Sequence, residues 1–258
     1  MKKMLAVGCS FTKGTGLKDE DKNPRLWINQ LHKMIWPDHE LLNLAQVGKN
    51  NEWIFFETMT ALIKERYDVV VVAWTSIPRF NITVGLELYC TETRLTDDGA
   101  EIRLNSGDVF TTKYQKKIGD YVRRLHHDHW GILNMIKCIN TLIEIQKLHQ
   151  GEIWFVNALG PWSNGYFEKK VIKYPNDLTE YEKKLLSIQT RDDEEIFKLY
   201  EKIHNEYAYY GGIHEDRWVN LYESLVSIAI DHASLTDKHP GVLSQDLFVE
   251  TLKQKFLL

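Results

Sequence analysis

The sequence is 258 residues long, with 43% hydrophobic and 26% charged residues, a composition typical of a globular protein that excludes a disordered or collagen-like chain. A formal net charge of −4 argues against a general nucleic-acid-binding surface, which needs a stripe of basic residues. No stretch approaches the about 18 consecutive apolar residues of a membrane-spanning helix. We therefore expect neither a nucleic acid nor a membrane among the partners of this chain.

The cysteines and the first residues indicate a cytoplasmic location. Cys9, Cys90 and Cys138 are odd in number and lack the spacing of a metal or redox motif, so we expect reduced thiols, with Cys9 a small buried residue. The basic start is followed by too few apolar residues for a secretory signal. Together these features favour the cytoplasm.

Short apolar runs and helical spacing alternate along the first quarter of the chain. Residues 3–7 form an apolar run too short for anything but a buried strand, and a glycine ends it. A helix is expected after Pro24, a strand over 41–45 and a second helix over 51–66. The second helix should bury five apolar side chains: Ile54, Phe55, Met59, Leu62 and Ile63.

Residues 68–74 contain four consecutive valines, and such an unbroken β-branched run is typical of a strand covered on both faces. We expect this run to be the central strand, with residues 75–79 as its exit loop. The segment from 86 to 119 interrupts the alternation of strands and helices, with turn signals at 97–99 and 105–107. It predicts a β-hairpin excursion or a partly ordered lid.

Helical spacing returns over residues 129–149, where isoleucines recur along one face, and a strand is expected over 152–157. The charged segment from 162 to 212 is predicted to be a second excursion, more cap than domain. Residues 218–221 fit a fifth strand, although a helix beginning at Val219 is an alternative reading of the same pattern.

The last helix is expected to start near Ser244 as its N-cap and to bury four side chains: Leu247, Phe248, Leu252 and Phe256. Strand and helix thus alternate through the whole chain, which predicts an α/β protein with a central parallel sheet and helices on both faces. We expect a single domain over residues 1–258, with insertions near 86–119 and 162–212.

Ser10 stands where the first strand stops, within Gly8-Cys9-Ser10-Phe11-Thr12-Lys13-Gly14. In open α/β sheets ligands bind beyond the carboxyl ends of the strands, so a hydroxyl delivered there can act as a nucleophile. A Gly-x-Ser sequence after a strand is also an ordinary turn and helix cap. Both interpretations are open at this point.

A serine hydroxyl needs a base, and His239 in Asp237-Lys238-His239-Pro240 is the best candidate among ten histidines. A carboxylate two residues away can orient the imidazole and stabilise its cation, and the proline keeps His239 extended. The same four residues also fit a polar turn. The tract 126–129, His-His-Asp-His, fits a solvated helix start better than a metal site, because adjacent ligands on one turn point in different directions.

Three short blocks, Gly8 to Thr12, Gly48 with Asn50 and Asn51, and Asp237 to Pro240, occur in this order over almost the whole chain. Their combination resembles the SGNH, or GDSL-like, hydrolase family. The resemblance implies a flavodoxin-like three-layer α/β/α sandwich and a serine hydrolase that needs no cofactor and no metal.

The resemblance also implies a role for each matching residue. Ser10 would be the nucleophile, His239 the general base and Asp237 the acid that orients it. The backbone amides of Ser10 and Gly48 would bind the oxyanion. Such donors matter because each stabilises the negative charge of the tetrahedral intermediate by a few kcal/mol.

The sequence departs from the family in two places. The third block of the family supplies an asparagine to the oxyanion site, whereas this strand exits as Ala-Trp-Thr-Ser over 73–76. Asn51 or the Thr75 hydroxyl could take that place, and we favour Asn51. The family's commoner acid lies three residues before the histidine, where this chain has Thr236; if Asp237 is misplaced, Asp231, a backbone carbonyl or a Ser-His dyad would serve.

The hypothesis favoured by the sequence is a serine esterase acting on a small-molecule or carbohydrate ester, with an O-acetyl group as the substrate that the resemblance implies. Arg79, just beyond the central strand, could bind an anionic group of the substrate or pair with a surface acid. An acyltransferase using the same serine and a non-catalytic binding module are the alternatives. A homodimer is compatible with the fold, although no heptad or apolar stripe argues for one.

Overall fold

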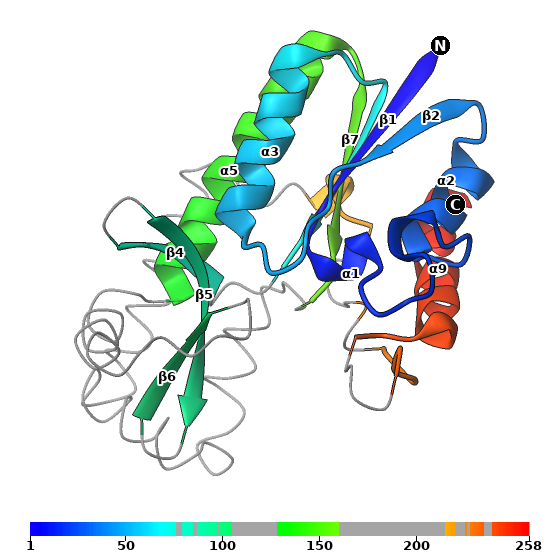
Figure 1. The fold of residues 1–258 in the computed structure, drawn as a ribbon. Helices are drawn as coiled ribbons and strands as arrows, with labels where there is room; N and C mark the ends of the chain where they lie inside the picture. Colours follow the sequence, from blue (N-terminus) through cyan, green and yellow to red (C-terminus); the bar gives the residue numbers. More distant parts are fainter. Residues whose placement is uncertain are drawn as a thin grey trace, which may run out of the picture.

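The computed structural model describes residues 1–75, 79–84, 87–96, 99–104, 128–159, 215–219, 225, 228–234 and 239–257. A four-stranded parallel sheet lies at its centre, in the order β2-β1-β3-β7 (Figure 1). Its strands are β1 (Lys2–Val7), β2 (His39–Asn43), β3 (Val69–Trp74) and β7 (Glu152–Asn157). Every residue of β3 is buried, which confirms the prediction of a central strand from its four valines.

The parallel strands follow the flavodoxin-like order, with the second strand outside the first and the third on its other side. Among the described residues, a fifth position beside β7 is marked by an isolated bridge, in which Trp218 pairs in parallel with Phe155. The Val219 amide donates to the Phe155 carbonyl at 3.0 Å, and the Leu225 amide to the Asn157 carbonyl at 3.3 Å. The described part of the predicted fifth strand is therefore a single bridge rather than a full strand.

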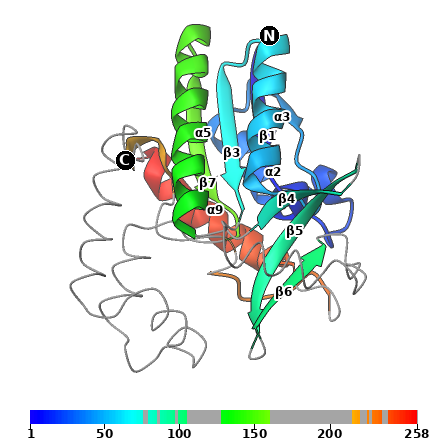
Figure 2. The same ribbon diagram turned by 90° about the vertical axis from the view of Figure 1, so that its left-hand side faces the viewer.

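Helices cover both faces of the sheet. Helices α3 (Asn51–Lys64) and α5 (Asp128–His149) pack against the face that carries Leu5 and Val7, and Figure 2 shows them side by side in front of the strands. Helices α2 (Trp27–Ile35) and α9 (Val242–Leu257) cover the opposite face. The chain therefore has the three-layer α/β/α sandwich that the sequence led us to expect.

Two apolar residues expected in the core are exposed. Ile63 is 74% exposed, because it follows the buried Ile54 by about two and a half helical turns and so lies on the outer face of α3. Leu247 is 40% exposed, whereas its neighbour Phe248 is fully buried. Ser244 is also not an N-cap, since α9 begins at Val242.

A separate antiparallel sheet follows the central strand, with the order β4-β5-β6. It consists of β4 (Arg79–Val84), β5 (Glu87–Thr96) and β6 (Gly99–Leu104). The β5–β6 pair confirms the predicted hairpin. The sheet starts earlier than expected, because Arg79 belongs to β4 rather than to a loop. The rest of the first insertion and all of the second lie outside the described residues.

The side chains of two of the three cysteines, Cys9 and Cys138, are described, and both are buried free thiols. Burial raises the pKa of the Cys138 thiol to about 12, so this thiol stays protonated at neutral pH. Within the described ranges no helix is both long and apolar enough to span a bilayer.

Candidate active site

The turn that carries Ser10 is tightly packed at the carboxyl end of β1. After Val7 the chain enters α1 (Ser10–Lys13), and the Cys9 carbonyl accepts hydrogen bonds from the Thr12 and Lys13 amides at 3.0 Å. A Cβ at Gly8 would lie 2.4 Å from the Thr12 Oγ1 atom, so only glycine fits there. Cys9 occupies the N-cap of α1, and Ser10 is the 4% exposed first residue of the helix. The Ser10 hydroxyl therefore does not cap the helix.

The loop that contains Gly48 runs beside this turn. Beyond β2 the chain continues to pair with the first strand, because the Leu44 amide donates to the Ala6 carbonyl at 2.8 Å and the Gln46 amide to the Gly8 carbonyl at 3.1 Å. Gly48 has a φ of +71°, a left-handed conformation that favours glycine. The sheet thus brings the two predicted oxyanion residues, Ser10 and Gly48, to neighbouring strand ends.

Asn43, which belongs to none of the predicted site motifs, links this loop to α1. Its Nδ2 atom donates to the Thr12 carbonyl at 2.9 Å, and its Oδ1 atom accepts from the Ala45 amide at 3.0 Å. An asparagine at a strand end is visible in the sequence, but its partner is 31 residues away and only the parallel pairing brings the two together.

Asn51 joins the same loop to the end of β3. Its Oδ1 atom accepts from the Thr75 amide at 2.7 Å, and its Nδ2 atom donates to the Thr75 carbonyl at 3.0 Å. A further contact of 3.4 Å runs from Nδ2 to the Met135 sulfur. The structure therefore brings Asn51 and Thr75 together, with the amide group of Asn51 bound to the backbone of Thr75. The oxyanion role expected for Asn51 stays a prediction.

His239 reaches this end of the sheet from the other end of the sequence. Its segment pairs with residues 231–233 through the antiparallel bridge His232–Pro240 and through a 2.8 Å hydrogen bond from the Ala233 amide to the His239 carbonyl. The imidazole ring lies 5.1 Å from the ring of Phe11, centroid to centroid, at an angle of 46°. Since Phe11 directly follows Ser10, the predicted base lies beside the nucleophile turn.

Asp231, one of the alternatives to Asp237, caps α9. Its carboxylate accepts from the Leu243 amide at 3.0 Å, from the Ser244 amide at 2.7 Å and from the Ser244 hydroxyl. Burial alone would raise the pKa of Asp231, but the hydrogen bonds from Ser244 and Leu243 together hold it below its ordinary value. Both carboxylate oxygens thus accept hydrogen bonds from amides in the first turn of α9, the role that the sequence assigned to Ser244.

The remaining predicted site residues are less fully placed. Asp237 and Thr236 lie outside the described residues. Arg79 opens β4 and is the register partner of Glu92, but its side chain is not described, so its anion-binding role stays a prediction. Among the described residues, no group of three or more His, Cys, Asp or Glu side chains could hold a metal ion. His126 and His127 are not described.

Comparisons with known proteins add little to this geometry. The sequence matches no family model and no curated protein. Three similar solved structures are TesA (10% identity, TM-score 0.45), a lipase/acylhydrolase from Enterococcus faecalis (11%, 0.44) and a mutant of Axe2, an acetyl-xylooligosaccharide esterase from Geobacillus (9%, 0.42). The matches cover 99–100% of this chain and 94–98% of those chains. Identities and TM-scores this low do not assign an activity to this chain.

Proposed function

We propose that the protein is a serine esterase of the SGNH type, with Ser10 as the nucleophile, His239 as the general base and Asp237 as the acid that orients the imidazole. The contact between the rings of Phe11 and His239 is the observation that supports this proposal best. It brings a histidine from the last twenty residues of the chain next to the turn that carries the serine. Such a convergence at the carboxyl end of a parallel sheet is where an α/β enzyme carries its site.

The reaction would run in two halves. His239 takes the proton of Ser10 while Oγ attacks the ester carbonyl carbon, and the tetrahedral intermediate then expels the alcohol, which receives that proton from the imidazolium. Water, deprotonated by His239, next attacks the acyl-serine. Collapse of the second intermediate releases the carboxylic acid and returns the proton to Ser10.

The oxyanion would be bound by the amides of Ser10 and Gly48 and by the hydroxyl of Thr75. The Ser10 amide lies at the first position of α1, where a backbone amide has no acceptor within the helix. We propose Thr75 rather than Asn51 as the third donor, because the amide group of Asn51 binds the Thr75 carbonyl and contacts the Met135 sulfur. The pairing also fixes the backbone of Thr75.

The substrate is proposed to be an ester with a small acyl group, an acetyl group on a carbohydrate being the choice implied by the resemblance. We expect p-nitrophenyl acetate to be cleaved with a higher kcat/KM than the butyrate or octanoate ester. No cofactor takes part in the proposed reaction.

Reaction with a fluorophosphonate probe tests the proposal directly. We expect the probe to add once per chain on the peptide that contains Ser10, not to react with Ser10→Ala, and to react far more slowly with His239→Ala, which loses the base but keeps the serine. His232→Ala is the matched control, since His232 is an exposed histidine on the same two-stranded bridge and should leave labelling unchanged. A folded protein that is not labelled at Ser10 would contradict the esterase. Labelling of Ser10 accompanied by acyl transfer to added sugar alcohols rather than to water would favour the acyltransferase.

A further inference from the structure

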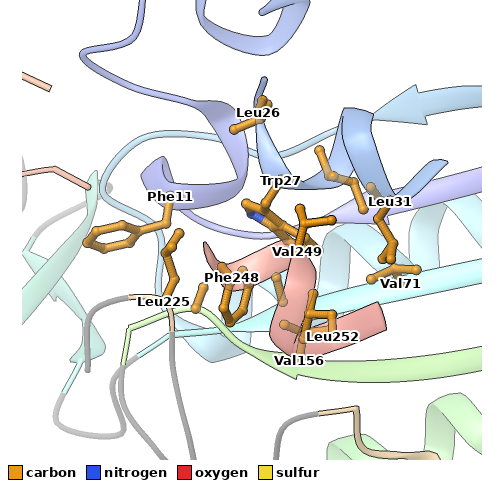
Figure 3. Packing of buried hydrophobic residues seen from close by; sticks show 14 of the residues in the cluster. Phe11, Leu26, Trp27, Leu31, Val71, Val156, Leu225, Phe248, Val249 and Leu252 are labelled. Carbon is orange, nitrogen blue, oxygen red and sulfur yellow. The ribbon is translucent and has the colours of Figure 1, made fainter. Parts of the chain in front are cut away.

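Phe11 belongs to the apolar core and to the candidate site at once. It is 7% exposed and packs in the buried cluster between the sheet, α2 and α9, at whose edge it lies in Figure 3. The same ring contacts the imidazole of His239.

We propose that Phe11 is a positioning residue whose ring holds the imidazole of His239 beside Ser10. The inference rests on the proposed roles of Ser10 and His239. The backbone of His239 is already held by Ala233, whereas the orientation of its ring depends on what the ring touches. A flat aromatic ring against the imidazole restricts its rotation, and its π electrons attract the imidazolium that forms when the base takes the proton.

The contact also couples the base to the nucleophile through α1. This helix is fixed by the hydrogen bonds of the Cys9 carbonyl and by the close packing of Gly8 against Thr12, so Ser10 and Phe11 move together. A general base must stay within hydrogen-bond reach of the proton that it removes. A ring attached to the nucleophile's own turn would limit changes in the distance between Ser10 and His239, because a displacement of Ser10 also displaces the ring that contacts the imidazole.

Phe248 provides a matched control for the packing role of Phe11. It is a fully buried phenylalanine of the same cluster, and its ring contacts Trp27 edge-on at 5.5 Å and 81°. Phe11→Leu and Phe248→Leu make the same chemical change in the same core. Only the first removes the ring that touches His239.

The experiment measures the fluorophosphonate labelling rate of Ser10 per folded molecule, together with kcat and KM for p-nitrophenyl acetate. Phe11→Leu should slow labelling about tenfold or more and lower kcat while KM changes little, because a misplaced base impairs proton transfer rather than binding. Phe11→Tyr, which keeps the ring, should recover most of the rate. Phe248→Leu should lower the Tm but label at the rate of the unchanged protein. Equal slowing by both leucine variants would overturn the proposal.

A double-mutant cycle shows whether Phe11 acts through His239. In the His239→Ala background we expect Phe11→Leu to change the residual labelling rate less than twofold, since the imidazole that Phe11 positions has been removed. If the two residues acted independently, their effects on the labelling rate would instead multiply, and Phe11→Leu would slow labelling by the same factor in both backgrounds. The full tenfold loss in that background would overturn the proposal, because Phe11 would then act on Ser10 directly. If labelling of Ser10 requires His239 but proceeds at an unchanged rate in Phe11→Leu, this inference alone is overturned. Absence of His239-dependent labelling in the unchanged protein would overturn both proposals.

Discussion

The turn that carries Ser10 and the segment that carries His239 meet at one end of the sheet but are held there by different interactions. The Ser10 side consists of three strand ends that are bound to one another: the Gln46 amide to the Gly8 carbonyl, Asn43 to the Thr12 carbonyl, and Asn51 to Thr75. The His239 side is attached through the bridge to residues 231–233 and through the capping of α9 by Asp231.

Because different interactions hold the two sides, each side should respond to a different kind of perturbation. Close packing and uncharged hydrogen bonds join the three strand ends on the Ser10 side, and the ion pair of α1, Lys13 with Asp21, is partly exposed to solvent and so contributes little. Changes in side-chain volume should therefore disturb this side more than changes in pH. A carboxylate holds the His239 side, so its attachment depends on charge. Variants can therefore be chosen that loosen one side and leave the other intact.

The largest effect is expected for Thr75→Val on the Ser10 side. The change removes the proposed third oxyanion donor while keeping the shape of the side chain, so kcat should fall about 100- to 1,000-fold, as for other lost oxyanion donors, with KM little changed. Thr58→Val is the control, because Thr58 is a buried threonine whose hydroxyl binds the Ile54 carbonyl within α3. An unchanged kcat in Thr75→Val, together with a large loss in Asn51→Ala, would return the donor role to Asn51.

The next effect is expected for Gly8→Ala. Its Cβ would lie 2.4 Å from Thr12 Oγ1 and 3.0 Å from the Ala73 Cβ, and overpacking of this kind costs about 1–3 kcal/mol of unfolding free energy. Urea unfolding measures this loss, and because α1 must shift, the labelling rate of Ser10 should fall as well.

Gly151→Ala is the matched control for Gly8→Ala. A Cβ there would lie 2.5 Å from the Tyr67 carbonyl oxygen, just before β7 and at the opposite end of the sheet from Ser10. It should destabilise the fold and leave labelling per folded molecule unchanged. Equal losses of labelling in the two variants would mean that the tight packing around Gly8 does not position Ser10 in particular.

The sequence predicted the elements whose burial pattern is local and missed the contacts between distant residues. Four valines predicted β3, and the spacing over 129–149 predicted α5, because the hydrophobic periodicity of a strand or helix can be recognised from residues close together in the sequence. Ser244 is a good N-cap residue by type, but Asp231, thirteen residues earlier, caps that helix. Its role depends on the bridge that brings the two segments together, which no local pattern encodes.

In the candidate site, too, local features could be predicted from the sequence and contacts between distant residues could not. The end of the first strand predicted the place of Ser10, because ligands bind beyond the carboxyl ends of parallel strands, whereas the pairing of Ser10 with Gly48 was implied only by the resemblance. The partners of Asn43, Asn51 and Phe11 could not be predicted, since each lies between 24 and 228 positions away in the sequence and depends on the register of the sheet or on the return of the chain after α5.

A smaller effect is expected for Asp231→Ala on the His239 side. Loss of a helix cap costs about 1–2 kcal/mol of unfolding free energy, and the loosened segment should also lower the labelling rate at Ser10. Asp246→Ala is the control. Asp246 is an acidic residue of the same helix, and it forms an ion pair with the exposed side chain of Arg25. A surface ion pair of this kind contributes little. If Asp231→Ala unfolded more easily but labelled normally, the cap would stabilise the fold without positioning His239.

The smallest effect concerns pH. The pKa of Asp231 is lower in the folded chain than its ordinary value of 3.8, so its contribution to stability is fully present above that value and is lost as the pH falls through the lower folded pKa. Asp231→Asn cannot titrate there. The difference in unfolding free energy between the unchanged protein and Asp231→Asn should therefore be constant from pH 7 to about pH 5 and shrink below about pH 4. Urea unfolding at each pH measures this difference. If it stayed constant down to pH 3, the hydrogen bonds of the cap would not depend on the charge of Asp231. The two sides of the site would then be held by the same kind of interaction.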